Sequence, residues 1–142
     1  MALRFIEHGT EEYDQMVDLR MKVLRIPLGL TLTKEELETE KENILLGCFE
    51  DEVLVGCCML VKTEPKTVRL RQMAVLEGVQ GKGIGKLLMI YAENVAKEEG
   101  NKKIVMHARK TAIGFYEKLG YSLNGEEYLE VGIPHYDMEK GL

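Results

Sequence analysis

The sequence predicts an α/β fold in which helices accompany a central mixed β-sheet. Between residues 44 and 75 the apolar residues alternate or run without interruption, as in β-strands, whereas from Ile84 to Val95 they recur with a helical period. A further strand is predicted after that helix, and a strand-helix-strand passage of this length implies a right-handed parallel crossover. The 142 residues suit a single domain that spans residues 1–142.

The composition is that of a folded globular protein, because 45% of the residues are hydrophobic and 30% are charged. The 24 acidic residues outnumber the 19 basic ones, and the net charge of -5 repels nucleic acid and anionic membranes. We therefore expect no nucleic-acid partner, and an anionic ligand has to be attracted by local charges. No apolar run reaches the roughly 18 residues of a membrane span, and the first residues lack the features of a secretory signal. We expect no membrane partner and a cytoplasmic location.

The three cysteines are predicted to be reduced and buried. Their number is odd, so they cannot all pair within the chain. Cys57 and Cys58 are adjacent in a predicted strand, where neighbouring side chains point to opposite faces. They cannot bind one metal ion together, and we expect no metal.

The first predicted elements are a short strand at residues 3–7 and a helix that begins after Thr10. A threonine at this position can accept a hydrogen bond from a free amide, and the acidic residues after it suit the positive end of the helix dipole. Pro27 and Gly29 follow the apolar stripe of this helix, which therefore ends near Ile26.

Arg20 lies on the apolar stripe of the first helix, between Met16 and Val23. Its side chain either runs along the apolar surface to the edge of the stripe or points into a pocket. The spacing alone leaves both interpretations open.

A short charged helix and three strands are predicted next. The helix opens with a capping-box pattern, and the strands are apolar runs separated by polar turns. On the third of these strands Val68 and Leu70 alternate with Arg69 and Arg71, which predicts one apolar and one basic face. The predicted ranges are 33–41 for the helix and 44–49, 53–61 and 67–75 for the strands.

The second half of the chain is predicted to contain two helices and three strands. The longer helix carries a strong apolar stripe and ends at Gly100, and the shorter one ends before Gly120. The predicted ranges are 84–99 and 111–119 for the helices, 104–107 for a strand, and two short strands around Tyr128 and Tyr136. The whole sheet would then have about six to seven strands, with about four helices.

The segment between the third long strand and the long helix has the character of a phosphate-binding loop. Glycines at positions 81, 83 and 85 let an anion approach the backbone amides, and the helix start supplies free N–H donors and a positive dipole end. Lys82 and Lys86 add positive charge. The pattern matches neither a Walker A loop, which needs Ser or Thr where Leu87 stands, nor a dinucleotide fingerprint, which needs a third glycine three residues on. A glycine-rich turn without a ligand is the alternative interpretation.

Three segments resemble motifs of the GCN5-related N-acetyltransferase (GNAT) family. The first resembles the pyrophosphate loop Q/R-x-x-G-x-G/A, and the second resembles a helix signature that ends in Phe-Tyr-x-x-x-Gly-Phe/Tyr. The third resembles the tail of the small bacterial subgroup typified by ElaA. In this sequence they are Gln80-Gly81-Lys82-Gly83-Ile84-Gly85, Phe115-Tyr116-Glu117-Lys118-Leu119-Gly120-Tyr121 and Glu130-Val131-Gly132-Ile133-Pro134-His135.

The resemblance implies a GNAT-like fold that binds acetyl-coenzyme A. In the family the third long strand carries a bulge and diverges from its parallel neighbour, which leaves a wedge for the pantetheine arm. Backbone groups of Met73, Ala74 and Val75 would hold the pantetheine, and amides of the glycine loop would hold the pyrophosphate. Arg109 stands where many relatives carry an Asn that contacts the cofactor. The remaining implied cofactor-binding residues are Gln80, Gly81, Lys82, Gly83, Ile84, Gly85, Lys86 and Phe115.

The resemblance also implies roles in the reaction. Tyr116 corresponds to the family tyrosine that donates a proton to the leaving thiolate, although its place on the apolar stripe of its helix also suits simple packing. His135 is the first candidate for the base and His107 the second, because histidine exchanges protons near neutral pH. Arg20 and Arg71 are the candidates for binding an anionic acceptor substrate.

Together these features predict an N-acetyltransferase that moves an acetyl group from acetyl-CoA to a primary amine of a small molecule or peptide. A non-catalytic acyl-CoA sensor or interaction module on the same fold is the alternative. The strands of the tail could also pair between two subunits, so a homodimer is considered as well.

Overall fold

The computed structural model describes residues 1–79 and 82–142, whose strands form one eight-stranded sheet. The strands are hydrogen-bonded in the order β1-β2-β3-β4-β5-β8-β6, and β7 pairs with β8. This arrangement confirms the predicted mixed α/β fold class, with slightly more strands than expected. The chain divides into two compact units, one of Met1–Leu60 and Gln72–Ala92 and the other of Val61–Arg71 and Glu93–Leu142. The predicted single-domain organisation remains a prediction.

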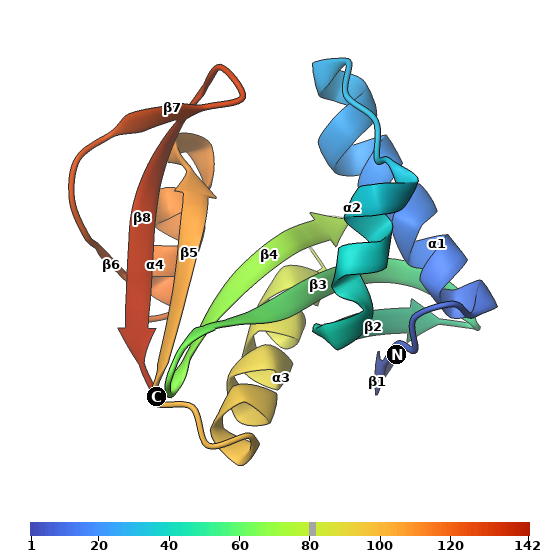
Figure 1. Ribbon diagram of the computed structural model, residues 1–142, viewed down its shortest axis with the longest axis horizontal. Coiled ribbons are helices and arrows are strands. Elements are labelled where there is room, and N and C mark those ends of the chain that lie inside the picture. Colours follow the sequence, from blue (N-terminus) through green and yellow to red (C-terminus); the bar gives the residue numbers. More distant parts are fainter. Residues whose placement is uncertain (80–81) are drawn as a thin grey trace. The chain divides into compact units, whose positions relative to one another are not determined.

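The first unit is built on antiparallel strands (Figure 1). β1 pairs with β2, and β2 pairs with β3 across a two-residue turn. Asp51 and Glu52 in this turn have φ angles of 50° and 64°, as a turn that follows the twist of a hairpin requires. The strands of this part of the sheet are β1 (Ala2–Phe5), β2 (Ile44–Glu50), β3 (Val53–Glu64) and β4 (Thr67–Val75), of which β3 and β4 continue into the second unit.

The helices of the first unit begin at the predicted caps. The hydroxyl of Thr10 accepts a hydrogen bond from the amide of Tyr13 at 3.3 Å, and that of Thr33 accepts one from Glu36 at 3.2 Å. Among the described residues, none of the helices combines the length and the apolar character needed to cross a membrane. The helical elements are α1 (Glu11–Arg20), the π-helical turn η1 (Met21–Arg25), the 3₁₀ turns η2 (Ile26–Leu28) and η3 (Thr39–Glu42), α2 (Lys34–Glu38), and α3 (Ile84–Glu98), which runs on into the second unit.

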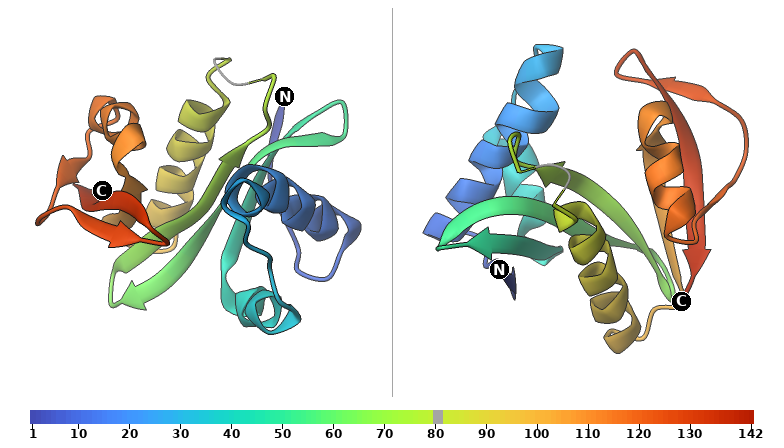
Figure 2. Two further views of the ribbon diagram at one scale, coloured as in Figure 1. Left: turned by 90° about the horizontal axis from the view of Figure 1, so that it is seen from above. Right: turned by 180° about the vertical axis from the view of Figure 1, so that it is seen from behind.

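Strand β3 is covered on both faces, and residues 54–60 are all buried. Figure 2 shows α1 and α3 on opposite sides of these strands. Gly56 faces α3, because a Cβ atom at this position would lie 2.8 Å from Ile84 and 2.9 Å from Leu88. Cys57, the next residue, faces the other layer, where the charge of Arg20 acts on its thiol. The continuous apolar run of β3 follows from this burial on both faces.

The three cysteines are free and buried, which confirms the prediction. Burial raises the pKa of all three thiols, and it raises that of Cys57 to about 12. Because the thiolate is the reactive form, these side chains should react slowly with thiol reagents while the protein is folded.

The second unit combines a parallel and an antiparallel pair of strands. Residues 67–70 of β4 pair in parallel with residues 103–106 of β5, and β5 pairs antiparallel with β8 along its whole length. The parallel pairing across the α3 connection confirms the predicted crossover. The elements are β5 (Lys103–Arg109), η4 (Lys110–Ala112), α4 (Ile113–Lys118), β6 (Ser122–Leu123), β7 (Tyr128–Glu130) and β8 (Ile133–Gly141).

The tail of the chain differs from the prediction of two short strands. β8 has nine residues and pairs with β5 on one side and with β6 and β7 on the other. Its alternating pattern is hidden because only His135 and Met138 are fully buried, while Asp137, Glu139 and Lys140 place charges at three of the other positions. β8 is therefore an inner strand, and the short strands β6 and β7 lie beyond it in the described part of the sheet.

Lys140 of β8 connects the middle of α3 to the end of α4. Its ammonium group donates hydrogen bonds to the carboxylate of Glu93 in α3 at 2.9 Å and to the carbonyl of Leu119 after α4 at 2.7 Å. The hydroxyl of Tyr121 donates to the same carboxylate at 3.0 Å. A lysine that binds the last carbonyls of a helix also suits the negative end of its dipole, so these contacts hold α4 in place.

Replacing Gly56 with alanine is expected to destabilise the protein, because the new methyl group would overlap buried side chains of α3. We expect a loss of about 1–3 kcal/mol in the free energy of unfolding, the usual cost of overpacking a core. Urea denaturation followed by circular dichroism measures it. Gly114→Ala is the matched control, because this glycine lies in α4 with no heavy atom within 4 Å of a Cβ, and alanine there should leave stability unchanged or raise it. Equal stability of the Gly56→Ala variant and the wild type would contradict the described packing.

Candidate active site

Strand β4 leaves the regular β conformation at Gln72. This residue has a φ angle of 58°, a left-handed conformation that costs a non-glycine residue roughly 1–2 kcal/mol. The parallel pairing of β4 covers residues 67–70, so the strained residue follows two positions after the last paired one. Such strain persists where the surroundings enforce it and is concentrated at functional sites. The conformation agrees with the strand bulge that the resemblance implies.

Residues 73–75, which complete β4, are the predicted contacts of the pantetheine arm. Ala74 is 2% exposed, and its two neighbours are half-buried. The amide of Leu76 donates a hydrogen bond to the carbonyl of Val55 at 2.8 Å, which ties the end of this segment to β3. These residues therefore lie on a backbone segment that is held in the core of the first unit.

The glycine loop leads directly into α3. Gln80 and Gly81 lie outside the described residues. Gly83 has a φ angle of 77°, and no heavy atom of the described residues lies within 4 Å of its Cβ position. Lys82 and Lys86 are exposed on either side of it. The first amides of an α-helix have no acceptor within the helix, and α3 is 15 residues long. The loop thus combines an open backbone, free N–H donors and two cations, which suits an anionic ligand.

The first turn of α3 is anchored by its apolar side. Ile84 is 2% exposed and packs where Gly56 of β3 leaves space. Gly85, the next residue, is half-buried. This packing fixes the start of the helix, and with it the direction of the free amides.

Helix α4 carries the aromatic pair Phe115 and Tyr116. Their ring centroids are 5.0 Å apart in an edge-on arrangement, and the ring of Tyr116 lies edge-on to that of Tyr121 at 5.9 Å. Tyr116 is 7% exposed and Phe115 is 39% exposed. The carbonyl of Tyr116 accepts hydrogen bonds from the amides of Leu119 and Tyr121. Tyr116 is therefore held firmly, and packing accounts for part of its position on the helix stripe.

His107 and His135, the two candidate bases, meet at one carboxylate. Oε1 of Glu130 lies 2.9 Å from Nδ1 of His107, and Oε2 lies 3.6 Å from Nε2 of His135. The side chain of His107 is 33% exposed, whereas that of His135 is 5% exposed. Nδ1 of His135 donates a hydrogen bond to the carbonyl of Ile133 at 2.8 Å. Of the two rings, His107 is the one that solvent or a substrate can reach.

Three further side chains complete a group that we call the histidine cluster. Nη2 of Arg69 lies 2.8 Å from Nδ1 of His107, and Oδ1 of Asp137 lies 3.7 Å from Nε2 of the same ring. The hydroxyl of Tyr128 donates to Oδ1 of Asp137 at 2.6 Å. Burial and this neighbouring carboxylate raise the pKa of Tyr128, so its phenol stays protonated. The cluster consists of Arg69, His107, Tyr128, Glu130, His135 and Asp137.

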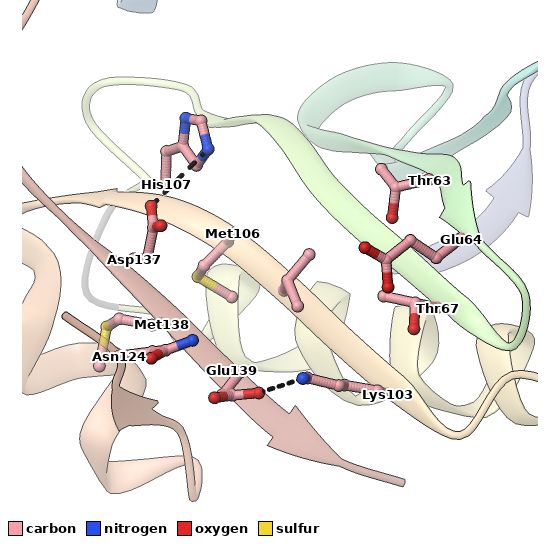
Figure 3. A pocket seen from close by; sticks show the side chains of 11 residues that line it. Thr63, Glu64, Thr67, Lys103, Met106, His107, Asn124, Asp137, Met138 and Glu139 are labelled. Carbon is pink, nitrogen blue, oxygen red and sulfur yellow. Dashed lines mark ion pairs between the residues drawn. The ribbon is translucent and has the colours of Figure 1, made fainter.

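The histidine cluster borders a surface pocket of about 250 Å³ (Figure 3). His107 and Asp137 point toward one another at one end of it, and Lys103 and Glu139 form an ion pair farther along. Glu64 also lines the pocket. Its lining offers both charges and a titratable ring, which a small polar ligand could use.

The two predicted substrate arginines have different surroundings. Arg71 is exposed on β4. Arg20 is 0% exposed, and its two terminal nitrogens donate to the oxygens of Glu40 at 2.8 and 2.7 Å. The hydroxyl of Tyr13 donates to the same carboxylate at 2.7 Å. A substrate could reach the Arg20 guanidinium only by displacing Glu40, so the structure does not support a substrate contact for Arg20 and instead gives it a structural ion pair.

Residues 29–142 match the family model described as an acetyltransferase (GNAT) domain. The chain belongs to the GNAT family. The protein YyaT of Bacillus subtilis (strain 168) is 36% identical over 108 residues, which make up 76% of this chain and 71% of YyaT. This match supports the same grouping.

Two solved structures show the same fold as this GNAT chain. Escherichia coli ElaA aligns with a TM-score of 0.84 and 18% identity, and the alignment covers 98% of both chains. An aminoglycoside 6'-N-acetyltransferase complexed with coenzyme A aligns with a TM-score of 0.83 and 18% identity, covering 99% of this chain and 97% of that one. At this level of identity the likeness concerns the fold.

Several polar residues of the GNAT chain were not singled out from the sequence. Glu130 lies in the tail motif without a predicted role, and Tyr128 and Asp137 are predicted only as parts of short strands. Polar side chains stand at alternate positions in residues 128–130 and 135–139, and alternate residues of a strand point to the same face. This spacing is the signal that places Tyr128 on one face with Glu130, and His135 on one face with Asp137. Glu40 had no such signal, because it lies in a charged segment that was expected to bury little.

Removing the charge of Glu40 is expected to destabilise the protein strongly. Glu40→Gln leaves the buried guanidinium of Arg20 without its counter-ion, which typically costs about 3–5 kcal/mol. Urea denaturation measures the free energy of unfolding. Glu38→Gln is the control, because Glu38 pairs with Lys41 where both side chains are exposed, and such pairs contribute little. Similar losses in the two variants would show that the Arg20 pair is not buried as described.

Proposed function

We propose that the protein is an N-acetyltransferase that moves the acetyl group of acetyl-CoA to a primary amine of a small molecule or peptide. The observation that carries this proposal is the pair of left-handed residues Gln72 and Gly83, the first a strained residue near the end of strand β4 and the second an open glycine directly before the long helix α3. The resemblance to the GNAT family assigns the coenzyme to this strand end and this loop, and the two conformations support that assignment.

The coenzyme would be held by backbone groups along this segment. Residues 73–75 would bind the pantetheine arm, and amides between Gln80 and Lys86 would bind the pyrophosphate. Support comes from the open space at Gly83 and from the exposed lysines beside it. Phe115, which is partly exposed, would add an apolar contact to the coenzyme. The coenzyme supplies the activated acetyl group, and no metal is included in the proposal.

Tyr116 would donate a proton to the departing thiolate. A phenol is a hydrogen-bond donor near neutral pH, and a positioned donor of this kind typically contributes 10²–10⁴-fold to a rate. The packing against Phe115 and Tyr121 supports this role, because it fixes the ring in one orientation. This role would add to the packing role of the same ring.

The acceptor amine has to lose a proton before it can attack. An amine with a pKa of about 10.4 is neutral in only about one molecule in 2,500 at pH 7, a deficit of roughly 4.6 kcal/mol, whereas an α-amine near pKa 8 loses only about 1.4 kcal/mol. A base is therefore needed most for lysine-like acceptors. His135 and His107 are the candidates in this chain, and exposed Arg71 would bind an anionic group of the acceptor.

Thiol release in the presence of acetyl-CoA and a panel of amines, amino sugars and peptides tests the activity. We expect release with at least one acceptor, and the buried cysteines should add little background. Tyr116→Phe should lower kcat by about 10²-fold or more through loss of the proton donor. Tyr91→Phe is the control, because the ring of Tyr91 packs against Phe5 in the first unit. Tight coenzyme binding without release from any acceptor would favour the sensor, and an unchanged kcat in Tyr116→Phe would remove Tyr116 from the mechanism.

Replacing Gly83 with alanine should weaken coenzyme A binding by roughly tenfold, since the new Cβ disfavours the left-handed backbone that exposes the amides. Isothermal titration calorimetry measures the Kd. Gly9→Ala is a matched control, because Gly9 has a similar φ angle of 82° and equally open surroundings. Both variants should lose similar stability, and only Gly83→Ala should lose affinity. Equal affinity in the two variants would contradict the assigned loop.

A further inference from the structure

Two side chains lie within hydrogen-bond distance of Nδ1 of His107, and this atom can bind only one of them at a time. Nη2 of Arg69 lies 2.8 Å from Nδ1, and Oε1 of Glu130 lies 2.9 Å from the same nitrogen. A guanidinium can only donate a hydrogen bond, and a carboxylate can only accept one. Nδ1 therefore binds Arg69 when it carries no proton and Glu130 when it does.

This choice determines what the other ring nitrogen can do. If Nδ1 of the neutral ring accepts from Arg69, the proton sits on Nε2 and that atom cannot act as a base. If Nδ1–H donates to Glu130, Nε2 keeps its lone pair and can take a proton. Nε2 lies on the side of Asp137, whose carboxylate at 3.7 Å would stabilise a positive ring or attract an ammonium group.

We propose that His107 is the base of the transferase reaction and that Glu130 and Arg69 compete for its Nδ1 atom, so that the partner at Nδ1 sets whether Nε2 can accept a proton. This inference rests on the proposed function. In the step, an N–H bond of the acceptor ammonium breaks, an N–H bond forms at Nε2, and the neutral amine keeps its electron pair for the attack. The ring passes the proton to water after turnover.

His107 suits this role better than His135, the first candidate from the sequence. His135 is almost fully buried, and its Nδ1–H is held by the carbonyl of Ile133. Its Nε2 faces Glu130 at 3.6 Å. His135 is therefore a buried ring with one nitrogen already engaged, whereas His107 borders the pocket (Figure 3).

The charged and titratable groups around His107 come from three strands. Arg69 lies on β4, Tyr128 and Glu130 on β7, and Asp137 on β8. The edge of the Tyr128 ring faces that of His107 at a centroid distance of 5.8 Å. Glu130 and Asp137 offer acceptors to the ring and Arg69 offers a donor, so the position of the ring proton depends on which of them is engaged.

The tautomers of the three histidines can be measured without knowing the acceptor. In a ¹⁵N-labelled full-length chain, long-range ¹H–¹⁵N spectra at a pH where the rings are neutral distinguish Nδ1–H from Nε2–H. His135, bound through Nδ1 to a carbonyl, and His8, bound through Nε2 to the carbonyl of Leu37, provide one reference of each kind. Single His→Gln variants assign the signals.

We expect Glu130→Met to shift His107 to the Nε2–H form and Arg69→Met to shift it to the Nδ1–H form. Glu127→Met is the control, because Glu127 pairs with Lys110 and should leave the tautomer unchanged. An unchanged His8 signal and an unchanged circular dichroism spectrum show that a variant is folded, whereas the His135 signal can respond to Glu130→Met directly because Glu130 lies 3.6 Å from its Nε2. If neither Glu130→Met nor Arg69→Met alters the His107 spectrum, the proposed competition is wrong.

Kinetics with an acceptor from the amine panel test the catalytic part. His107→Gln should lower kcat/KM at pH 7 by about 10²-fold or more, and Glu130→Met should lower kcat and shift the acidic limb of its pH profile. A His107→Gln enzyme with the wild-type rate and pH profile would overturn the assignment. Absence of thiol release with every amine would contradict the proposed function itself, and the tautomer spectra would show separately whether the competition at Nδ1 exists.

Discussion

The backbone of β4 is the constraint on which the candidate site depends. A strand pairs with its neighbour only while its residues keep extended φ angles, and Gln72 has a φ angle of 58°. The parallel pairing with β5 covers residues 67–70, ahead of this residue. Backbone N–H and C=O groups beyond a bulge need hydrogen-bond partners outside the regular pairing. The amide of Leu76 donates to the carbonyl of Val55. An extended ligand that offers amides and carbonyls, such as a pantetheine arm, matches this kind of backbone.

The chain places its charges in two contrasting ways. In the first unit, Arg20 and Glu40 are buried together and satisfy each other, with Tyr13 as a third member. Such a pair is fixed because breaking it leaves an uncompensated charge in the core. In the second unit the histidine cluster stays partly exposed and has more acceptors and donors than one arrangement can satisfy. The buried group around Arg20 stabilises the fold, whereas His107 in the histidine cluster can exchange one hydrogen-bond partner for another.

Much of the candidate site could be predicted from local sequence. The glycine loop, the start of α3 and the aromatic pair of α4 depend on residues that are neighbours along the chain, so their pattern is visible in a short window. The histidine cluster was only half predicted, because His107 and His135 were identified but Glu130 and Arg69 were not placed against them. Those contacts join β4, β5, β7 and β8, and strand register determines them.

The sequence by itself determined the order of the main helices and strands, the helix starts at Thr10 and Thr33, the crossover around α3 and the family, because each depends on local periodicity, capping or motif spacing. The partners of its polar side chains were decided only by the tertiary structure. Arg20 looked like a surface or pocket residue until η3 brought Glu40 to it, and β8 looked like a short strand until β5, β6 and β7 paired with it. A hydrogen bond or an ion pair depends on distance in space, and sequence spacing does not specify that distance for residues on different elements.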